Sequence, residues 1–353
     1  MSKTIKRLII IILILILMVI GSLALYFNSC LKPVSNISEK VNFTIESNTS
    51  SRQVLSNLKN EGIIKEDRLT YFYVRFFHPS SFKAGEYELD KSMSFNEIID
   101  YLSSSKNAIQ NTVTITFKEG EWLKHYASKL AEVTNVSYDE LMNYWNDEEV
   151  LKGFMNEYPF LTEDIFNDEI RYPLEGYLFP DTYEFYRETS PEAITKRFLD
   201  HTLNIYNAYL NEFNNNSLSI HEIFTLASIV QYEANNYDDM TKVASVFYNR
   251  MEEGMPLQSS VTVCYAMDIE KGGDWRDCEY NPNYDSPYNT YMINGLTPGP
   301  ILNPGEEAIK AVLNPAKTDY LYFMADVCND GQVYYSSDYQ THQKYIDKYL
   351  TCY

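Results

Sequence analysis

Residues 220–236 (IHEIFTLASIVQYEANN) are the stretch on which the interpretation of the fold depends. Four aliphatic residues in it recur at helical spacing: Ile223, Leu226, Ile229 and Val230. This spacing predicts a helix with one apolar stripe. Glu233 continues the stripe, so its side chain is predicted to face the core or the floor of a cleft.

A carboxylate in that position would lose solvation, and burial would raise the pKa of Glu233. A carboxylic acid that is still protonated near neutral pH can serve as a general acid. Periodicity alone favours a simpler interpretation, in which Glu233 is an acid at a helix end and reaches solvent within one turn. Features elsewhere in the chain are needed to choose between these two interpretations of Glu233.

The segments on either side of this helix predict a larger α+β body over residues 111–353. A period-two pattern at 112–117 (TVTITF) predicts a strand. Further helices are expected at 122–133, 191–213, 238–253, 306–313 and 337–349, with strands at 320–325 and 333–336. Residues 255–306 are dense in Pro, Gly, Asn and Tyr and are predicted to be loops. Long loops inside a compact body generally carry function.

A smaller α+β module is predicted over residues 42–110. Its elements should follow in the order strand, helix, helix, strand, helix: 41–45, 51–60, 68–77, 84–89 and 95–105. Residues 29–41 are polar and irregular, which indicates a short tether before the module.

The first 28 residues resemble a membrane anchor. Lys3, Lys6 and Arg7 precede an uncharged run of twenty residues, 8–27 (LIIIILILILMVIGSLALYF). That length matches the thickness of a bilayer at helical rise, and no small-residue cleavage site follows it. The pattern predicts a transmembrane helix over 8–28 and a cell-membrane location as a single-pass protein. The tail 1–7 would be cytoplasmic and the rest extracytoplasmic, since basic residues flank the inner side.

Charge and cysteine content exclude several classes of partner and cofactor. The formal net charge is −20, and beyond residue 32 it is −24, because 25 Lys and Arg face 49 Asp and Glu. Such acidity argues against nucleic-acid binding. None of the five Cys residues forms a C-x-x-C pair or has His at zinc-site spacing, so no metal site is expected. Disulfides such as Cys264–Cys278 or Cys328–Cys352 are possible, and their pairing stays open.

Several common catalytic and nucleotide-binding motifs are absent from the sequence, which narrows the range of reactions to consider. The chain has no G-x-S-x-G, no H-E-x-x-H, no phosphate-binding glycine loop and no dinucleotide fingerprint. No cofactor is therefore expected. Chemistry by carboxylates remains, and glycoside cleavage is the reaction that uses it most characteristically.

Several runs together resemble the MltG/YceG-like endolytic murein transglycosylases. They are 174–183 (LEGYLFPDTY), 227–233 (ASIVQYE), 242–250 (KVASVFYNR), 257–259 (LQS), 286–291 (SPYNTY), 295–301 (GLTPGPI), 303–305 (NPG), 314–317 (NPAK) and 320–323 (YLYF). An earlier run, 82–87 (FKAGEY), is similar to the family's LysM-like module. The motifs occur in family order over most of the chain.

The resemblance implies an enzyme that cuts nascent peptidoglycan strands internally, at the bond between N-acetylmuramic acid and N-acetylglucosamine. It implies membrane-bound peptidoglycan synthases as partners. The family's catalytic glutamate falls on Glu233. The first acid of the family's E-K-E-like run is Gln231 here, and Gln258-Ser259-Ser260-Val261 departs from a more usual Q-[ST]-D-P.

Five more residues are candidates for the site. Gln258, Asn289 and Tyr291 are predicted to contact sugar, with turn stabilisation as the alternative. Glu175 and Asp181 flank an aromatic turn and could orient substrate or tune Glu233, unless they only hold backbone amides in a Pro-Gly-rich loop.

Two rival functions remain at this point. A muramidase would use the same glutamate with water as the nucleophile and leave a reducing end. A wall-binding scaffold would organise synthases without cutting.

Overall fold

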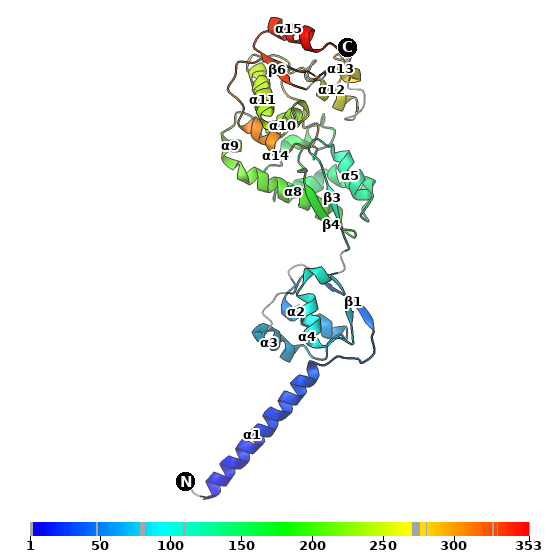
Figure 1. The fold of residues 1–353 in the computed structure, drawn as a ribbon, viewed down its shortest axis with the longest axis vertical. Helices are drawn as coiled ribbons and strands as arrows, with labels where there is room; N and C mark the ends of the chain where they lie inside the picture. The colour runs from blue at the N-terminus through cyan, green and yellow to red at the C-terminus, as the bar shows by residue number, and fades with distance from the viewer. Residues whose placement is uncertain are drawn as a thin grey trace. The chain divides into compact units, whose positions relative to one another are not determined.

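The structure is a computed structural model that describes residues 3–46, 49–77, 82–108, 111–269, 276–279, 281–326, 328–329 and 331–352. Side chains are described for these residues except 3–13, 105, 276 and 279. The chain divides into two compact units, Met1–Asn111 and Thr112–Tyr353 (Figure 1).

The first unit contains one antiparallel strand pair with helices packed on it. Its elements are α1 (Lys3–Cys30), β1 (Lys40–Ile45), α2 (Ser51–Asn60), α3 (Arg68–Phe77), β2 (Gly85–Asp90), α4 (Phe95–Leu102) and a 3-10 turn (Ser105–Asn107). Strand alternation places Phe43 directly opposite Tyr87 on the buried face. Ser94 and Glu97 form a capping box that starts α4.

The predicted transmembrane helix over 8–28 is corrected by the structure. Helix α1 does occupy this part of the chain. Within the residues that the structure describes, however, no helix has both the length and the apolar character that a membrane span requires. The predicted single-pass membrane location is wrong on the same finding.

The second unit is built mainly of helices, with two short antiparallel strand pairs. Its elements are β3 (Thr112–Thr116), α5 (Leu123–Ala131), α6 (Tyr138–Trp145), α7 (Glu148–Met155), a 3-10 turn (Glu163–Phe166), β4 (Thr182–Tyr186), α8 (Pro191–Ala208), α9 (Leu210–Asn215), α10 (Ile220–Glu233), α11 (Tyr237–Glu252), α12 (Ser260–Ala266), α13 (Arg276–Glu279), α14 (Glu306–Leu313), β5 (Tyr322–Ala325), β6 (Val333–Ser336) and α15 (Tyr339–Tyr349). Strand β3 pairs with β4, and β5 pairs with β6. Both units are thus mixed helix and sheet, which agrees with the α+β part of the predicted fold class.

Two predicted elements differ from those observed. The predicted helix 191–213 is broken at Tyr209, which separates α8 from α9. The predicted loop region 255–306 contains α12 and the short α13. A disulfide between Cys264 and Cys278 joins these two helices, and a second one links Cys328 to Cys352.

Helix α10 lies at the centre of the second unit. It packs against α11, α12 and α14, which Figure 1 shows around it. Residues 223–230 are buried without interruption, so the helix is covered on every side rather than along one stripe. Its polar residues find partners in the surrounding loops: His221 Nε2 lies 2.8 Å from the Pro298 carbonyl oxygen, and Ser228 Oγ accepts from the Ile301 amide at 3.0 Å.

Candidate active site

Glu233 is the last residue of α10. The helix begins at a capping box between Ser219 and Glu222 and ends where Ala234 takes an extended conformation (φ −138°, ψ 147°). Asn236 then caps α11. The partly buried carboxyl of Glu233 is therefore held at a sharp junction between two helices, at the carbonyl end of α10.

A serine from a distant segment holds this carboxyl. The Ser259 hydroxyl donates a hydrogen bond of 2.6 Å to Glu233 Oε1. Ser259 is buried and directly precedes α12. Ser259 belongs to one of the family motifs but was not among the predicted site residues. The sequence feature that could have identified Ser259 as a site residue was its position beside Gln258 in that motif.

Two buried threonines fix the backbone of Ser259. The Ser259 amide donates to Thr290 Oγ1 at 3.0 Å, and Thr262 Oγ1 donates to the Ser259 carbonyl at 2.7 Å. The two threonine hydroxyls are also 2.9 Å apart and bonded to each other. The segment that holds Ser259 against Glu233 is thus tied together by hydrogen bonds among hydroxyl and backbone groups.

Gln258, which directly precedes Ser259, has an unusual backbone conformation. Its φ of +52° is in the left-handed region, which is uncommon for residues other than glycine. The buried guanidinium of Arg250 holds the loop there, because its Nη1 donates to Leu257 O at 2.8 Å and to Gln258 Oε1 at 3.3 Å. Burial lowers the pKa of Arg250. The exposed side chain of Gln258 is the predicted sugar contact closest in sequence to Ser259.

A second polar cluster surrounds the last turn of α10. Gln231 Oε1 accepts from the Gly305 amide at 2.9 Å. Burial, and then the charge of Glu307, raise the pKa of Glu119, and a hydrogen bond with Gln231 opposes this shift. Gly305 leaves room for the Glu119 carboxyl, since a Cβ there would lie 2.1 Å from it. Glu119 was not among the predicted site residues.

Asn289 and Tyr291 lie in one tight turn. Asn289 is fully buried, and its Nδ2 donates to the carbonyls of Pro282 (2.9 Å) and Tyr284 (2.8 Å). Its Oδ1 accepts from the Tyr291 amide at 3.0 Å. These bonds fit the turn-stabilising alternative for Asn289. Tyr291 is half-buried and packs against the Cys264–Cys278 disulfide.

Asp181 lies beside the β3–β4 pair. Its Oδ1 accepts from the Thr182 amide at 2.6 Å, and its Oδ2 is 3.3 Å from His201 Nδ1. The Asp181 carbonyl accepts from the Phe117 amide at 2.9 Å. These contacts place Asp181 in the framework around the strand pair.

Glu175 joins two helices inside the core. Its Oε1 accepts from the Leu123 amide at 2.8 Å, in the first turn of α5, whose N-cap residue Trp122 makes no side-chain capping bond. Its Oε2 accepts from the Tyr265 hydroxyl at 3.4 Å. Glu175 thus caps α5 from a separate segment. Burial raises the pKa of Glu175 to about 8, and the bond from Leu123 opposes that shift.

This carboxyl should make folding stability pH-dependent. The folded state keeps the proton on Glu175 at pH values where the unfolded chain, with a glutamate pKa of about 4.3, has lost it. The stability that it contributes is therefore lost as pH rises from about 4.3 to about 8, by up to about 4 kcal/mol. Urea unfolding at pH 5 and pH 8 should show this loss in the wild type and a smaller one in Glu175→Gln. The exposed Glu188→Gln is the control, and equal losses in all three proteins would contradict the assignment.

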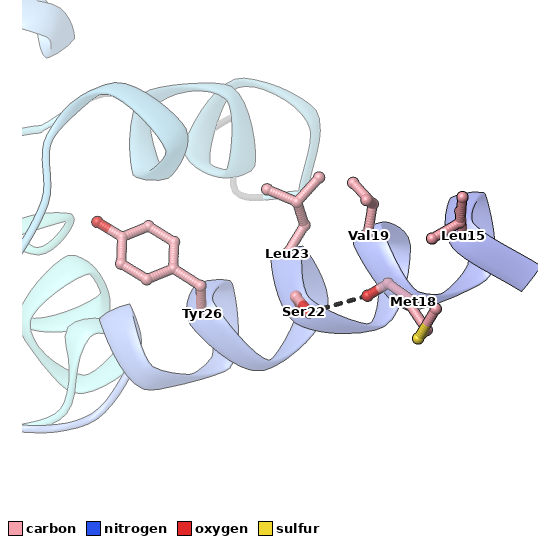
Figure 2. Close-up of a pocket in the computed structure, with 6 residues that line it drawn as sticks. All are labelled: Leu15, Met18, Val19, Ser22, Leu23 and Tyr26. Atoms are coloured by element: carbon pink, nitrogen blue, oxygen red, sulfur yellow. Dashed lines mark hydrogen bonds between the residues drawn. The ribbon is translucent and has the colours of Figure 1, made fainter.

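The hollow drawn in Figure 2 lies elsewhere, in the first unit. It is lined only by residues of α1: Leu15, Met18, Val19, Ser22, Leu23 and Tyr26. The Ser22 hydroxyl donates to the Met18 carbonyl at 2.8 Å, as the dashed line shows. The lining contains no carboxyl, so this hollow does not offer the chemistry found at Glu233.

Comparison with known proteins identifies the family. A sequence model of the YceG-like family matches residues 43–348, which is most of the chain and includes Glu233. The chain belongs to the YceG-like family. The resemblance inferred from the motifs is thereby confirmed.

Relatives of this YceG-like chain carry one shared description. The endolytic murein transglycosylase of Bacillus subtilis (strain 168) is 39% identical over 338 residues, which cover 95% of this chain and 92% of the relative. The endolytic murein transglycosylase of Streptococcus pneumoniae serotype 2 (strain D39 / NCTC 7466) is 31% identical; the match covers 92% of this chain but only 61% of that protein. A crystal structure of a yceG-like protein from Listeria monocytogenes has a TM-score of 0.61 and 32% identity, covering 87% of this chain and 99% of that one.

Among the described residues, no group of three or more His, Cys, Asp or Glu side chains is placed to hold a metal ion.

Proposed function

We propose that this YceG-like protein is an endolytic murein transglycosylase. It cleaves the β-1,4 bond between N-acetylmuramic acid and N-acetylglucosamine within nascent peptidoglycan strands, leaves 1,6-anhydro ends and so limits strand length. The shared description of its relatives supports this activity. The reaction is assigned to Glu233 because its carboxyl is held at a helix junction by the hydroxyl of Ser259, and this observation carries the proposal.

Glu233 is the proposed general acid and base. The end of α10 suits a neutral carboxyl, since the carbonyl end of a helix disfavours negative charge. Protonated Glu233 donates its proton to the glycosidic oxygen as the bond to the muramoyl C1 breaks. The resulting carboxylate takes the proton from the muramoyl C6 hydroxyl, whose oxygen forms the new bond to C1. Because the nucleophile belongs to the substrate, proximity replaces a bound water and a second catalytic carboxylate is not required.

The remaining predicted residues are proposed to act around this reaction. Gln258 has an exposed side chain beside Ser259, and Tyr291 has a half-buried ring in the facing turn, so both are proposed sugar contacts. Asn289, Glu175 and Asp181 are proposed to act through the segments that they hold, because their oxygens are bonded to backbone amides.

The first unit is proposed to be a LysM-like module that binds glycan. Its support is the strand–helix–helix–strand order with β1 and β2 paired antiparallel. Peptidoglycan synthases are proposed as partners, since an enzyme that cuts nascent strands must act where strands are made.

The distribution of product lengths tests the endolytic activity. Uncrosslinked glycan strands are incubated with the full chain, and products are separated by length at early times. Internal cutting predicts fragments of intermediate length before disaccharides accumulate. A distribution that contains disaccharides from the start would contradict the endolytic assignment, and strands that keep their length would favour the scaffold.

A further inference from the structure

We propose that Ser259 is a positioning residue for Glu233: its hydroxyl fixes the Oε1 oxygen and thereby the orientation of the carboxyl that exchanges a proton with substrate. This inference rests on the proposed function, since it assigns a role within the same reaction.

The hydrogen bond itself selects the oxygen. The Ser259 hydroxyl is the donor and Glu233 Oε1 the acceptor, at 2.6 Å. This bond restricts rotation of the carboxyl and so orients the group that exchanges a proton with the glycosidic oxygen.

The serine can do this because its backbone is fixed. Thr290 accepts from its amide, and Thr262 donates to its carbonyl. All three side chains are buried, with exposed fractions of 3% for Ser259 and 0% for both threonines. Rotation of the hydroxyl is the main freedom left to Ser259, and the Glu233 oxygen restricts it.

The loop that precedes Ser259 is also fixed by hydrogen bonds. Gln258 keeps its positive φ while its amide donates to the Thr290 carbonyl at 3.0 Å. The Arg250 guanidinium also holds this turn, because its Nη1 donates to Leu257 O and Gln258 Oε1. A strained residue maintained by several bonds next to a site residue is typical of a functional constraint.

The same bond also assists the chemistry. When Glu233 gives up its proton, Oε1 becomes part of a carboxylate, and a hydrogen bond to a charged acceptor is stronger than one to a neutral acceptor. Ser259 therefore stabilises the state that forms as the glycosidic bond breaks. Without it, the carboxylate is less favoured and the alkaline limb of the pH–rate profile moves to higher pH.

Three other titratable groups lie near the last turn of α10. Burial raises the pKa of Glu119, but its carboxyl is hydrogen-bonded to Gln231, so removal of the Ser259 hydroxyl should not shift its titration. Burial, and then the charge of Glu233, raise the pKa of Tyr232, so this phenol stays neutral across the working range. Arg250 stays charged, although burial lowers its pKa.

The experiment compares five full-length variants, one of which is Glu233→Gln, with the wild type on glycan strands. Ser259→Ala should lower kcat about 10- to 100-fold, as expected for a bond to a charged group, with little change in KM. Its alkaline limb should shift to higher pH. Ser259→Cys, which fills similar space with a weak donor, should show a smaller loss in the same direction.

Rescue and structural controls complete the test. Ser259→Thr keeps the hydroxyl on an extended backbone (φ −96°, ψ 115°) that suits a β-branched residue, so kcat and the pH profile should return toward the wild type. Ser245→Ala removes another buried serine, whose hydroxyl is 2.8 Å from that of Thr318, and should leave the pH profile unchanged.

Two outcomes would overturn the proposal. One is a Ser259→Ala protein with wild-type kcat and pH profile, while Glu233→Gln is inactive; this leaves the proposed function intact. The other is a loss in Ser259→Ala that Ser259→Thr does not restore and that leaves the pH profile unmoved, which indicates a packing role. Activity retained in Glu233→Gln would instead contradict the proposed function.

Discussion

Glu233→Gln should abolish strand cleavage, with a loss of about 10²–10⁴-fold in kcat. The amide cannot donate an acidic proton to the glycosidic oxygen or take one from the C6 hydroxyl. It keeps the size of the side chain and an oxygen that can still accept from Ser259, so the site should remain in place. New ends on purified glycan strands provide the measurement.

Two comparisons make this loss specific. Urea unfolding of Glu233→Gln should match the wild type, which separates a chemical defect from a folding defect. Glu121→Gln is a matched carboxyl-to-amide change at a residue whose carboxylate pairs with Lys129 at 2.6 Å, and it should keep activity. Cleavage by Glu233→Gln at the wild-type rate would rule out Glu233 as the acid, and a normal cellular role without cleavage would favour the scaffold.

Gly176→Ala should destabilise the protein by about 3 kcal/mol or more. Gly176 has a φ of +85°, and a Cβ there would lie 2.3 Å from Pro300 Cβ and 3.3 Å from the Leu302 carbonyl oxygen. The strain of a left-handed backbone and the overlap with Pro300 add together. The Gly176 amide also donates to Asn303 Oδ1 at 3.0 Å, so the segment cannot move away without losing that bond. The free energy of urea unfolding is the measurement.

Gly254→Ala is the matched control for this prediction. Gly254 follows α11 with a φ of +66°, but a Cβ there would have nothing within 4 Å. This variant should cost only the backbone strain, about 1–2 kcal/mol. If both variants lose the same stability, the close approach of residue 176 to Pro300 contributes nothing.

Much of the local structure was predictable because it depends on neighbours in sequence. Alternation predicted strands at 41–45 and 84–89, which correspond to the paired strands β1 and β2. Helical spacing predicted a helix over 220–236, which corresponds to α10, although α10 ends at Glu233. In both cases residues a few positions apart determine the pattern.

The surroundings of α10 were not predictable in this way. His221 and Ser228 interrupt the apolar pattern and suggest an exposed face, yet both are buried. Their partners, the Pro298 carbonyl and the Ile301 amide, come from a loop some 70 residues later. Polar residues become core residues only when such distant partners exist, and no local pattern reports that.

The site was predictable only in part for the same reason. The family motifs include one run with Glu233 and a separate run with Gln258-Ser259, but nothing in the spacing indicated that Ser259, rather than Gln258, would contact Glu233. Glu175 was predicted either to orient substrate or tune Glu233, or to hold backbone amides, and its contact with the Leu123 amide fits the second alternative. The predicted membrane helix was argued from an apolar run in the sequence, whereas no helix among the described residues has the length and apolar character of a membrane span.

The chemical identity of the new muramoyl end tests the central claim most directly. Glycan strands are digested by the wild-type chain in water enriched in heavy oxygen, and the products are measured by mass spectrometry. The proposed reaction predicts anhydro ends, lighter than reducing ends by one water and free of the heavy isotope, that disappear with Glu233→Gln. Reducing ends that carry the heavy oxygen would show that water is the nucleophile, and would make the protein a muramidase instead.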